Sequence, residues 1–265
     1  MIQAMDFTYD GISSESYHIL LCKINEHNLV ETLSAGSAVE LTTAKPARAR
    51  SWSYLGQQYT SPIEFDITIA KKDFSPISEA EQGLLNRWLI RTDGYKMFQF
   101  QSDEYADIAF FATATESTNV SINGHYGMTF HMVCNAPFAF KSKETEYVIP
   151  FDGNDTFLLY NTSDEVGDLD PWMEVKVEQD GDLEFTNALT GEKTLIRDCV
   201  RGEILSIDSQ NRKLSSSTGR IVLNDFNFIW PKLAKTYQSE ENLLSCSLPC
   251  TVTLRYREIR KVGVC

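Results

Sequence analysis

Histidine, cysteine and acidic side chains are the residues of this chain whose chemistry could support catalysis or hold a metal ion. The four histidines, His18, His27, His125 and His131, are scattered along the sequence. No two of them are spaced as ligands on one helix, and none lies in a metalloprotease pattern. His18 and His131 have apolar neighbours in strand-like alternations, so we expect structural roles for both.

The cysteines also show no clear catalytic or metal-binding pattern. There are six of them: Cys22, Cys134, Cys199, Cys246, Cys250 and Cys265. Cys246 and Cys250 are four residues apart, but no further Cys or His pair accompanies them, whereas zinc needs four ligands or three and a water. We expect two buried thiols flanking a loop. The opening residues lack a signal-peptide pattern, so reduced thiols in a cytoplasm are expected.

Calcium binding and sugar stacking are two further possibilities. Residues 164–170, DEVGDLD, carry several carboxylates but lack the spacing and terminal glutamate of an EF-hand loop, so a solvated surface loop is expected. Trp172 and Trp230 could stack on a sugar. Each adjoins a proline, Pro171 or Pro231, in a strand-end or loop setting, which favours a packing role.

Motifs that would indicate an enzyme are missing from the sequence. It contains no nucleophile elbow GxSxG, no P-loop and no GxGxxG. Carboxylates for glycoside hydrolysis cannot be paired without their separation in space. The sequence therefore predicts a protein that is not an enzyme and needs no cofactor or metal.

Composition narrows the classes further. The chain has 265 residues, 42% hydrophobic and 23% charged, which suits one large or two modest globular domains. A net charge of -13 argues against sequence-specific nucleic-acid binding, because that requires a basic surface. No apolar run approaches the ~18 residues of a membrane span, so no membrane insertion is expected.

The elements of the first half are mainly strands. FTYDGISSESYHILL reads as a strand, a glycine turn and a second strand. IEFDITIA alternates strictly between apolar and polar residues, which predicts a strand. A helix follows, with Ser78 as N-cap, Glu81 completing a capping box and Asp93-Gly94 as the stop. Its predicted apolar face contains Ala80, Leu84, Leu85, Trp88 and Leu89.

Residues 31–62 differ from these strands in being polar and small, with Pro46, Arg48 and Arg50, followed by the aromatic stretch SWSYLGQQY. A long hairpin or arm reaching out of the domain fits this segment better than a core element. The aromatic side chains of such an arm must be buried against something, and a neighbouring subunit is a natural partner.

A domain boundary is predicted near residue 140, where the pattern loosens around Pro137. Beyond it, short strand candidates are separated by turn signals such as Asp152-Gly153 and Thr190-Gly191, and the alternating TVTLRYREI closes the chain. This spacing predicts an antiparallel β-sandwich. We therefore expect domains at residues 1–140 and 141–265.

Several of these strings, taken in order, resemble the distal tail protein (Dit) family of siphophages, also called phage tail component. They are FTYDGISSESYHI, IEFDITIA, Arg87-Trp88-Leu89 ending the helix, Gly94-Tyr95, and INGHYGMTFHMVCNAPFAF. In the second half, DGDLEFTN, GEILSID and LNDFNFIWPKL resemble the family's weaker C-terminal pattern. The resemblance runs over some 230 residues and is stronger in the first half.

The resemblance implies a mainly β protein. Its N-terminal domain would be β-rich, with one helix and a protruding hairpin that joins copies into a hexameric ring, and its C-terminal domain would be a galectin-like β-sandwich. It also implies a structural hub at the distal end of a virion tail, assembled in the bacterial cytoplasm, around the channel through which DNA leaves. Partners would be the tail-tube protein and a tail-tip protein, with a receptor-binding protein as a further partner.

The polar arm falls where the family's ring-forming hairpin belongs. Trp52, Tyr54, Leu55 and Tyr59 are therefore predicted to contribute to the subunit contact, because aromatic side chains dominate the cores of such interfaces. The alternative is that these four residues pack on their own domain. Trp88, on the apolar helix face, is predicted to lie in the core.

One function of another class stays open. The C-terminal sandwich could be a carbohydrate-binding adhesion module, with a sugar held near Trp172 or Trp230. A galectin-like fold would not by itself indicate sugar binding.

Overall fold

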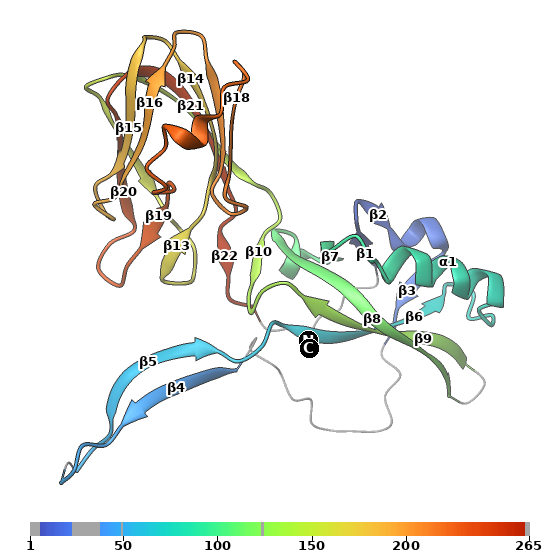
Figure 1. Ribbon diagram of the computed structural model, residues 1–265. Helices are drawn as coiled ribbons and strands as arrows, with labels where there is room; N and C mark the ends of the chain where they lie inside the picture. Colours follow the sequence, from blue (N-terminus) through green and yellow to red (C-terminus); the bar gives the residue numbers. More distant parts are fainter. Residues whose placement is uncertain (1–5, 23–37, 49, 123–124, 263–265) are drawn as a thin grey trace. The chain divides into compact units, whose positions relative to one another are not determined.

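The computed structural model describes residues 6–22, 38–48, 50–122 and 125–262, and within them the chain is mainly β-structure with one α-helix (Figure 1). The mainly β class predicted from the sequence is confirmed. The chain packs as two compact units, residues 1–142 with 260–265, and residues 143–259. No helix in the described residues is long and apolar enough to cross a membrane.

The N-terminal unit is built on a nine-stranded sheet. Its main path has the order β2-β1-β7-β8-β9-β6-β3, and β10 pairs with both β8 and β22. The strands are β1 (Asp6–Tyr9), β2 (Ile12–Ser13), β3 (Ile19–Leu21), β6 (Glu64–Lys71), β7 (Lys96–Gln101), β8 (Ile108–Ile122), β9 (His125–Cys134), β10 (Ala139–Lys141) and β22 (Ile259–Arg260).

The opening residues fold as a strand and a glycine turn, as predicted. Phe7 and Tyr9 on β1 are fully buried, and Asp10 and Gly11 both have positive φ, 53° and 75°. Glycine suits this turn because it adopts positive φ without strain. The second strand is interrupted, however, because the 3₁₀ turn η1 (Ser14–Tyr17) separates β2 from β3.

The predicted helix is α1 (Glu79–Leu89), and its N-terminus has the expected capping box. The Ser78 hydroxyl accepts a hydrogen bond from the Glu81 backbone N–H at 3.4 Å, and the Glu81 carboxylate accepts one from the Ser78 N–H at 2.7 Å. These contacts satisfy two of the N–H groups that a helix start leaves open.

The predicted apolar face of α1 is only partly right. Leu85, Trp88 and Leu89 are buried, whereas Leu84 is 48% exposed and Ala80 is exposed as well. A helix that packs by one narrow stripe leaves the flanking apolar residues in solvent. The helix also ends at Leu89, before the predicted stop.

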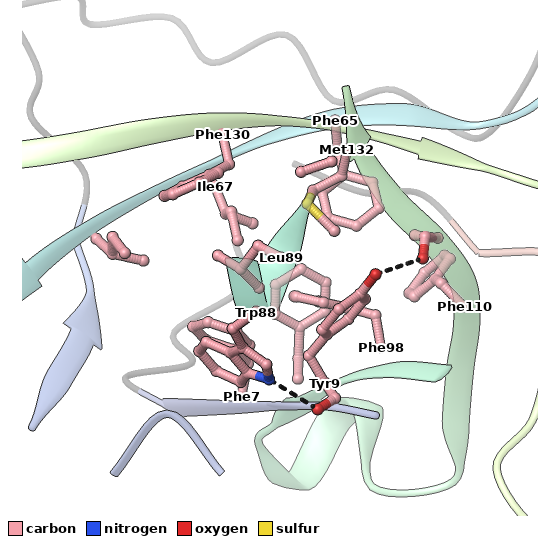
Figure 2. Packing of buried hydrophobic residues seen from close by; sticks show 14 of the residues in the cluster. Phe7, Tyr9, Phe65, Ile67, Trp88, Leu89, Phe98, Phe110, Phe130 and Met132 are labelled. Atoms are coloured by element: carbon pink, nitrogen blue, oxygen red, sulfur yellow. Dashed lines mark hydrogen bonds between the residues drawn. The ribbon is translucent and has the colours of Figure 1, made fainter. Parts of the chain in front are cut away.

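Trp88 lies in the N-terminal core, as predicted, and is only 4% exposed (Figure 2). Its indole N–H donates to the Tyr9 carbonyl at 3.2 Å, and its ring stacks on Phe7 with centroids 5.5 Å apart. The Tyr9 hydroxyl in turn donates to the Ala112 carbonyl at 3.2 Å. Helix, first strand and central sheet are thereby joined through buried aromatic rings whose polar atoms are satisfied.

The C-terminal unit is an antiparallel sandwich of a five-stranded sheet, β11-β21-β14-β17-β18, and a four-stranded sheet, β12-β20-β15-β16. Side chains from both sheets form one core cluster. The strands are β11 (Thr145–Asp152), β12 (Thr156–Tyr160), β14 (Trp172–Val177), β15 (Gly181–Asn187), β16 (Lys193–Cys199), β17 (Ile204–Asp208), β18 (Lys213–Ser216), β20 (Glu241–Cys246) and β21 (Pro249–Tyr256), with β13 (Gly167–Leu169) and β19 (Leu233–Lys235) paired beside them.

The predicted closing strand is β21, which lies inside the five-stranded sheet between β11 and β14. Its residues alternate between buried and half-buried along its whole length. Cys246 and Cys250 flank the turn that leads from β20 into β21, and both thiols are buried.

Candidate subunit interface

Two strands of the N-terminal unit form a ribbon of their own. β4 (Val39–Ala44) and β5 (Ser53–Tyr59) pair only with each other among the named strands of the described residues (Figure 1). They lie within the segment predicted as an arm, of which residues 31–37 and 49 fall outside the described residues. An isolated two-stranded hairpin is marginally stable in water, so this ribbon needs further contacts to be firmly ordered.

The register of the ribbon gathers apolar side chains on one face. Val39 lies opposite Tyr59, and Thr43 lies opposite Tyr54. Since side chains alternate along a strand, Leu41 shares that face with these four, as does Gln57, which lies opposite Leu41. A bulge between Thr42 and Thr43 resets the alternation on β5 so that Tyr54 joins this face.

The other face of the ribbon is polar. It carries Glu40, Thr42 and Gln58. The ribbon is thus amphipathic, yet its apolar residues are largely in solvent: Leu41 is 58% exposed and Tyr54 is 61% exposed. We call Val39, Leu41, Trp52, Tyr54 and Leu55 the ribbon patch. Large apolar side chains exposed together on one element are typical of a surface that another protein covers.

The base of the ribbon, in contrast, is packed on its own unit. The Tyr59 ring meets Phe138 edge-on with centroids 6.2 Å apart. Phe138 contacts Phe140 in the same way, and Phe140 contacts Phe111 on β8. These rings tie the end of β5 to the nine-stranded sheet.

The structure therefore separates the four predicted contact residues into two groups. Trp52, Tyr54 and Leu55 are more than three-fifths exposed, so they are free to meet a partner. Tyr59 is half-buried at the ribbon base. Sequence reasoning missed Val39 and Leu41, because only the pairing of β4 with β5 places them beside Tyr54.

The described histidines have structural surroundings. His131 on β9 hydrogen-bonds through Nδ1 to Asp66 on β6 at 2.8 Å, and its Nε2 lies 3.5 Å from Glu64. The hydrogen bond to Asp66, with the nearby charges of Glu64 and Glu116, raises the pKa of His131. His18 caps η1 in a left-handed conformation. His27 and the His125 side chain lie outside the described residues.

The buried cysteines are poor nucleophiles. Burial raises the pKa of Cys134 to about 12 and that of Cys199 to about 11. A hydrogen bond with Cys250, together with burial, raises the pKa of Cys246 further. The thiolate is the reactive form, so these thiols are inert at neutral pH. Cys265 lies outside the described residues.

Both tryptophans considered for sugar stacking are covered by arginine. The Arg255 guanidinium lies over the Trp172 ring at 4.8 Å, and Arg212 lies over Trp230 at 5.7 Å. Trp230 also packs edge-on against Phe226 with centroids 4.9 Å apart. A sugar would have to displace an arginine to stack on the covered faces, which favours packing roles for both rings.

Clusters that could bind a metal are missing from the described part of the chain: no three His, Cys, Asp or Glu residues there gather closely enough to hold an ion. This finding applies to residues 164–170 and to the Cys246–Cys250 pair.

The ribbon patch is therefore the candidate functional surface.

Comparison with known protein families shows to which class of protein the chain belongs. A family described as phage tail protein N-terminal domain matches residues 2–136, and one described as phage tail C-terminal domain matches residues 138–256. The first alone covers more than half of the chain. The chain therefore belongs to the phage tail proteins and is a structural component of the virion tail.

One solved structure has a similar fold. The fold is similar to the crystal structure of phage SPP1 Dit (gp 19.1), described as a paradigm of the hub adsorption apparatus in phages that infect Gram-positive bacteria. The TM-score is 0.69 at 12% identity, over 95% of this chain and 98% of that chain. The Dit-like fold predicted from the sequence is confirmed. No curated protein matches the chain.

Proposed function

We propose that this protein is the distal hub of a long non-contractile tail, in which six copies close a ring that joins the tail tube to the tail-tip proteins around the DNA channel. The ribbon patch is the observation that carries this proposal. A ring subunit repeats one head-to-tail contact until rotation closes it, and an amphipathic ribbon with an uncovered apolar face suits such a contact.

The two domains have different parts in the proposed ring. The N-terminal unit with its ribbon would build it, and the C-terminal sandwich would lie outside it. The Dit-like fold over nearly the whole chain supports this division. The partners would be further copies of this chain, the tail-tube protein, the tail-tip protein and a receptor-binding protein. The hub would act without catalysis at the distal end of the tail, after assembly in the host cytoplasm.

Electron microscopy and native mass spectrometry of the protein mixed with its tube and tip partners test the proposal. We expect closed six-membered rings. Replacing Trp52, Tyr54 and Leu55 together by serine should abolish the rings while leaving the melting temperature of the monomer unchanged, because these side chains are exposed in it. Particles that stay monomeric with both partners at high concentration would refute the ring.

A matched control separates loss of apolar area from disturbance of the ribbon. Thr42→Ser combined with Gln58→Asn makes small changes on the polar face of the same strands. This variant should assemble as the unchanged protein does. If it loses the rings as readily as the serine variant, the patch itself is not the contact.

A further inference from the structure

The turn that joins β4 to β5 carries a concentration of positive charge. Lys45, Arg48 and Arg50 lie within six residues of one another, and all three are exposed. We call these three residues the basic tip. Between residues 38 and 62 the single acidic residue is Glu40, so this segment has a formal net charge of +2. The whole chain carries -13, which leaves -15 for the remainder.

Within the described part of the chain, the basic tip has no ion-pair partner. Elsewhere in the described residues many cations are paired: Lys71 with Glu81 at 2.9 Å, and Arg220 with Glu203 at 2.7 Å. None of the three tip cations makes an ion pair with any residue that the structure describes. Among the described residues, the ribbon thus ends in positive charge that no acidic side chain pairs with, in a chain that is acidic as a whole.

The tip adjoins the ribbon patch directly. Trp52 follows Arg50 by two residues, and Thr43, opposite Tyr54, precedes Lys45 by two residues. Whatever covers the apolar face therefore meets the cations at its rim. Rim charges of this kind mainly accelerate encounter and fix which partner is accepted.

We propose that the basic tip docks on an acidic surface of a second copy of this chain, and that this charge pairing steers and strengthens ring closure. The inference rests on the proposed ring. The occupant is a second copy because the remainder of the same chain is strongly acidic, and because a head-to-tail contact brings unlike surfaces of identical chains together. Duplex DNA would attract the cations, but it offers no apolar surface for Leu41 and Tyr54.

A neutral-tip variant, with Lys45, Arg48 and Arg50 each changed to Gln, tests the charge pairing. A matched control changes Arg197, Arg201 and Lys213 to Gln, which removes the same charge from exposed side chains of the C-terminal unit. Assembly is followed by mass photometry with the tube and tip partners between about 0.1 M and about 1 M NaCl, where the Debye length falls from ~10 Å to ~3 Å.

For the unchanged protein we expect the association rate of copies to fall about tenfold or more over that range. The neutral-tip variant should start about tenfold slower at low salt and depend little on salt, while the control follows the unchanged protein. Melting curves of all three proteins should coincide, because neither the tip cations nor the three control cations make an ion pair with any described residue.

The outcomes are distinguishable. Rings that form at equal rates and with equal salt dependence in the neutral-tip variant overturn the charge pairing and leave the hub intact. The unchanged protein failing to form rings at any salt removes the hub proposal, and the pairing with it. Tip-dependent binding of a labelled DNA duplex, with ring formation unaffected, would assign the tip to nucleic acid instead.

Discussion

At the scale of single residues, the C-terminal unit buries the carboxylate of Glu203. The Glu203 side chain is fully buried and accepts hydrogen bonds from Arg220 Nε at 2.7 Å, from Ser216 and from the Val200 N–H. Burial by itself would raise the pKa of Glu203, but the hydrogen bonds from Arg220 and Ser216 prevail and lower it. Arg220 also reaches Asp225 at 2.7 Å, so it joins two segments of the unit.

Arg220→Met should be strongly destabilising, because it leaves the Glu203 carboxylate buried without its cation. We expect a loss of about 3–5 kcal/mol in urea unfolding at neutral pH. Adding Glu203→Gln should restore part of this loss. A single Arg220→Met variant as stable as the unchanged protein would contradict the network.

Because the pKa of Glu203 is lowered in the folded protein, its contribution to stability should depend on pH. A group with a depressed folded pKa contributes stability above its unfolded value, here 4.5, and this contribution is lost as the pH falls through the folded pKa. The stability difference between the unchanged protein and Glu203→Gln should therefore be full at pH 7 and shrink below about pH 4.5. Urea unfolding at a series of pH values measures it; a difference independent of pH would argue against an ionised Glu203.

The contribution of His131 to stability should depend on pH with the opposite sign to that of Glu203. Its pKa is raised, so the contribution of its contact with Asp66 is present below 6.5 and is lost as the pH rises through the folded pKa. Asp66→Asn should lower the free energy of unfolding by about 0.5 kcal/mol just below pH 6.5, and by almost nothing above the folded pKa of His131. The effect is small because both side chains are partly exposed and screened by solvent. An NMR titration should show the His131 pKa falling in this variant. An unchanged titration curve would show that Asp66 is not its partner.

At the scale of elements, the capping box decides where α1 starts and hence how Trp88 meets the sheet. Ser78→Ala removes the hydroxyl that accepts from the Glu81 N–H and should cost about 1 kcal/mol. Ser78→Thr keeps an oxygen there and serves as the control. Chemical denaturation distinguishes the two; equal stabilities would mean that tertiary packing alone holds the helix start.

The ribbon differs from α1 because its apolar side chains are not packed within the single chain. Its backbone groups are paired, but its apolar face is uncovered in the single chain. Such an element gains its stability from a partner, since few buried apolar contacts oppose its opening. Hydrogen exchange of β4 and β5 amides should be fast in the monomer and slow in the ring. Strong protection in the monomer would show that the ribbon needs no partner.

At the scale of the whole molecule, each compact unit has its own aromatic and aliphatic core. Domains with separate cores tend to unfold separately. Leu254→Ala, in the middle of β21, should cost about 3 kcal/mol and lower the melting temperature of the C-terminal unit alone. Phe98→Ala should act in the same way on the N-terminal unit. Calorimetry in which either substitution shifts a single joint transition would show one cooperative unit.

The sequence by itself determined the features that depend on local periodicity and capping. Alternation fixed β6 and β21, and the Ser78–Glu81 pair fixed the start of α1. The mainly β class followed from these patterns, since a pleated strand repeats every two residues and a helix every 3.6.

Only the tertiary structure decided which neighbours those elements meet. It left Leu84 in solvent, brought His131 to Asp66 from a strand distant in sequence, and set Val39 and Leu41 beside Tyr54 through the β4–β5 register and its bulge. It also returned the end of the chain to the N-terminal sheet through β22. Such contacts join residues far apart in the chain, so no local pattern encodes them. Sequence alone indicated an arm; the fold showed which face of it is uncovered.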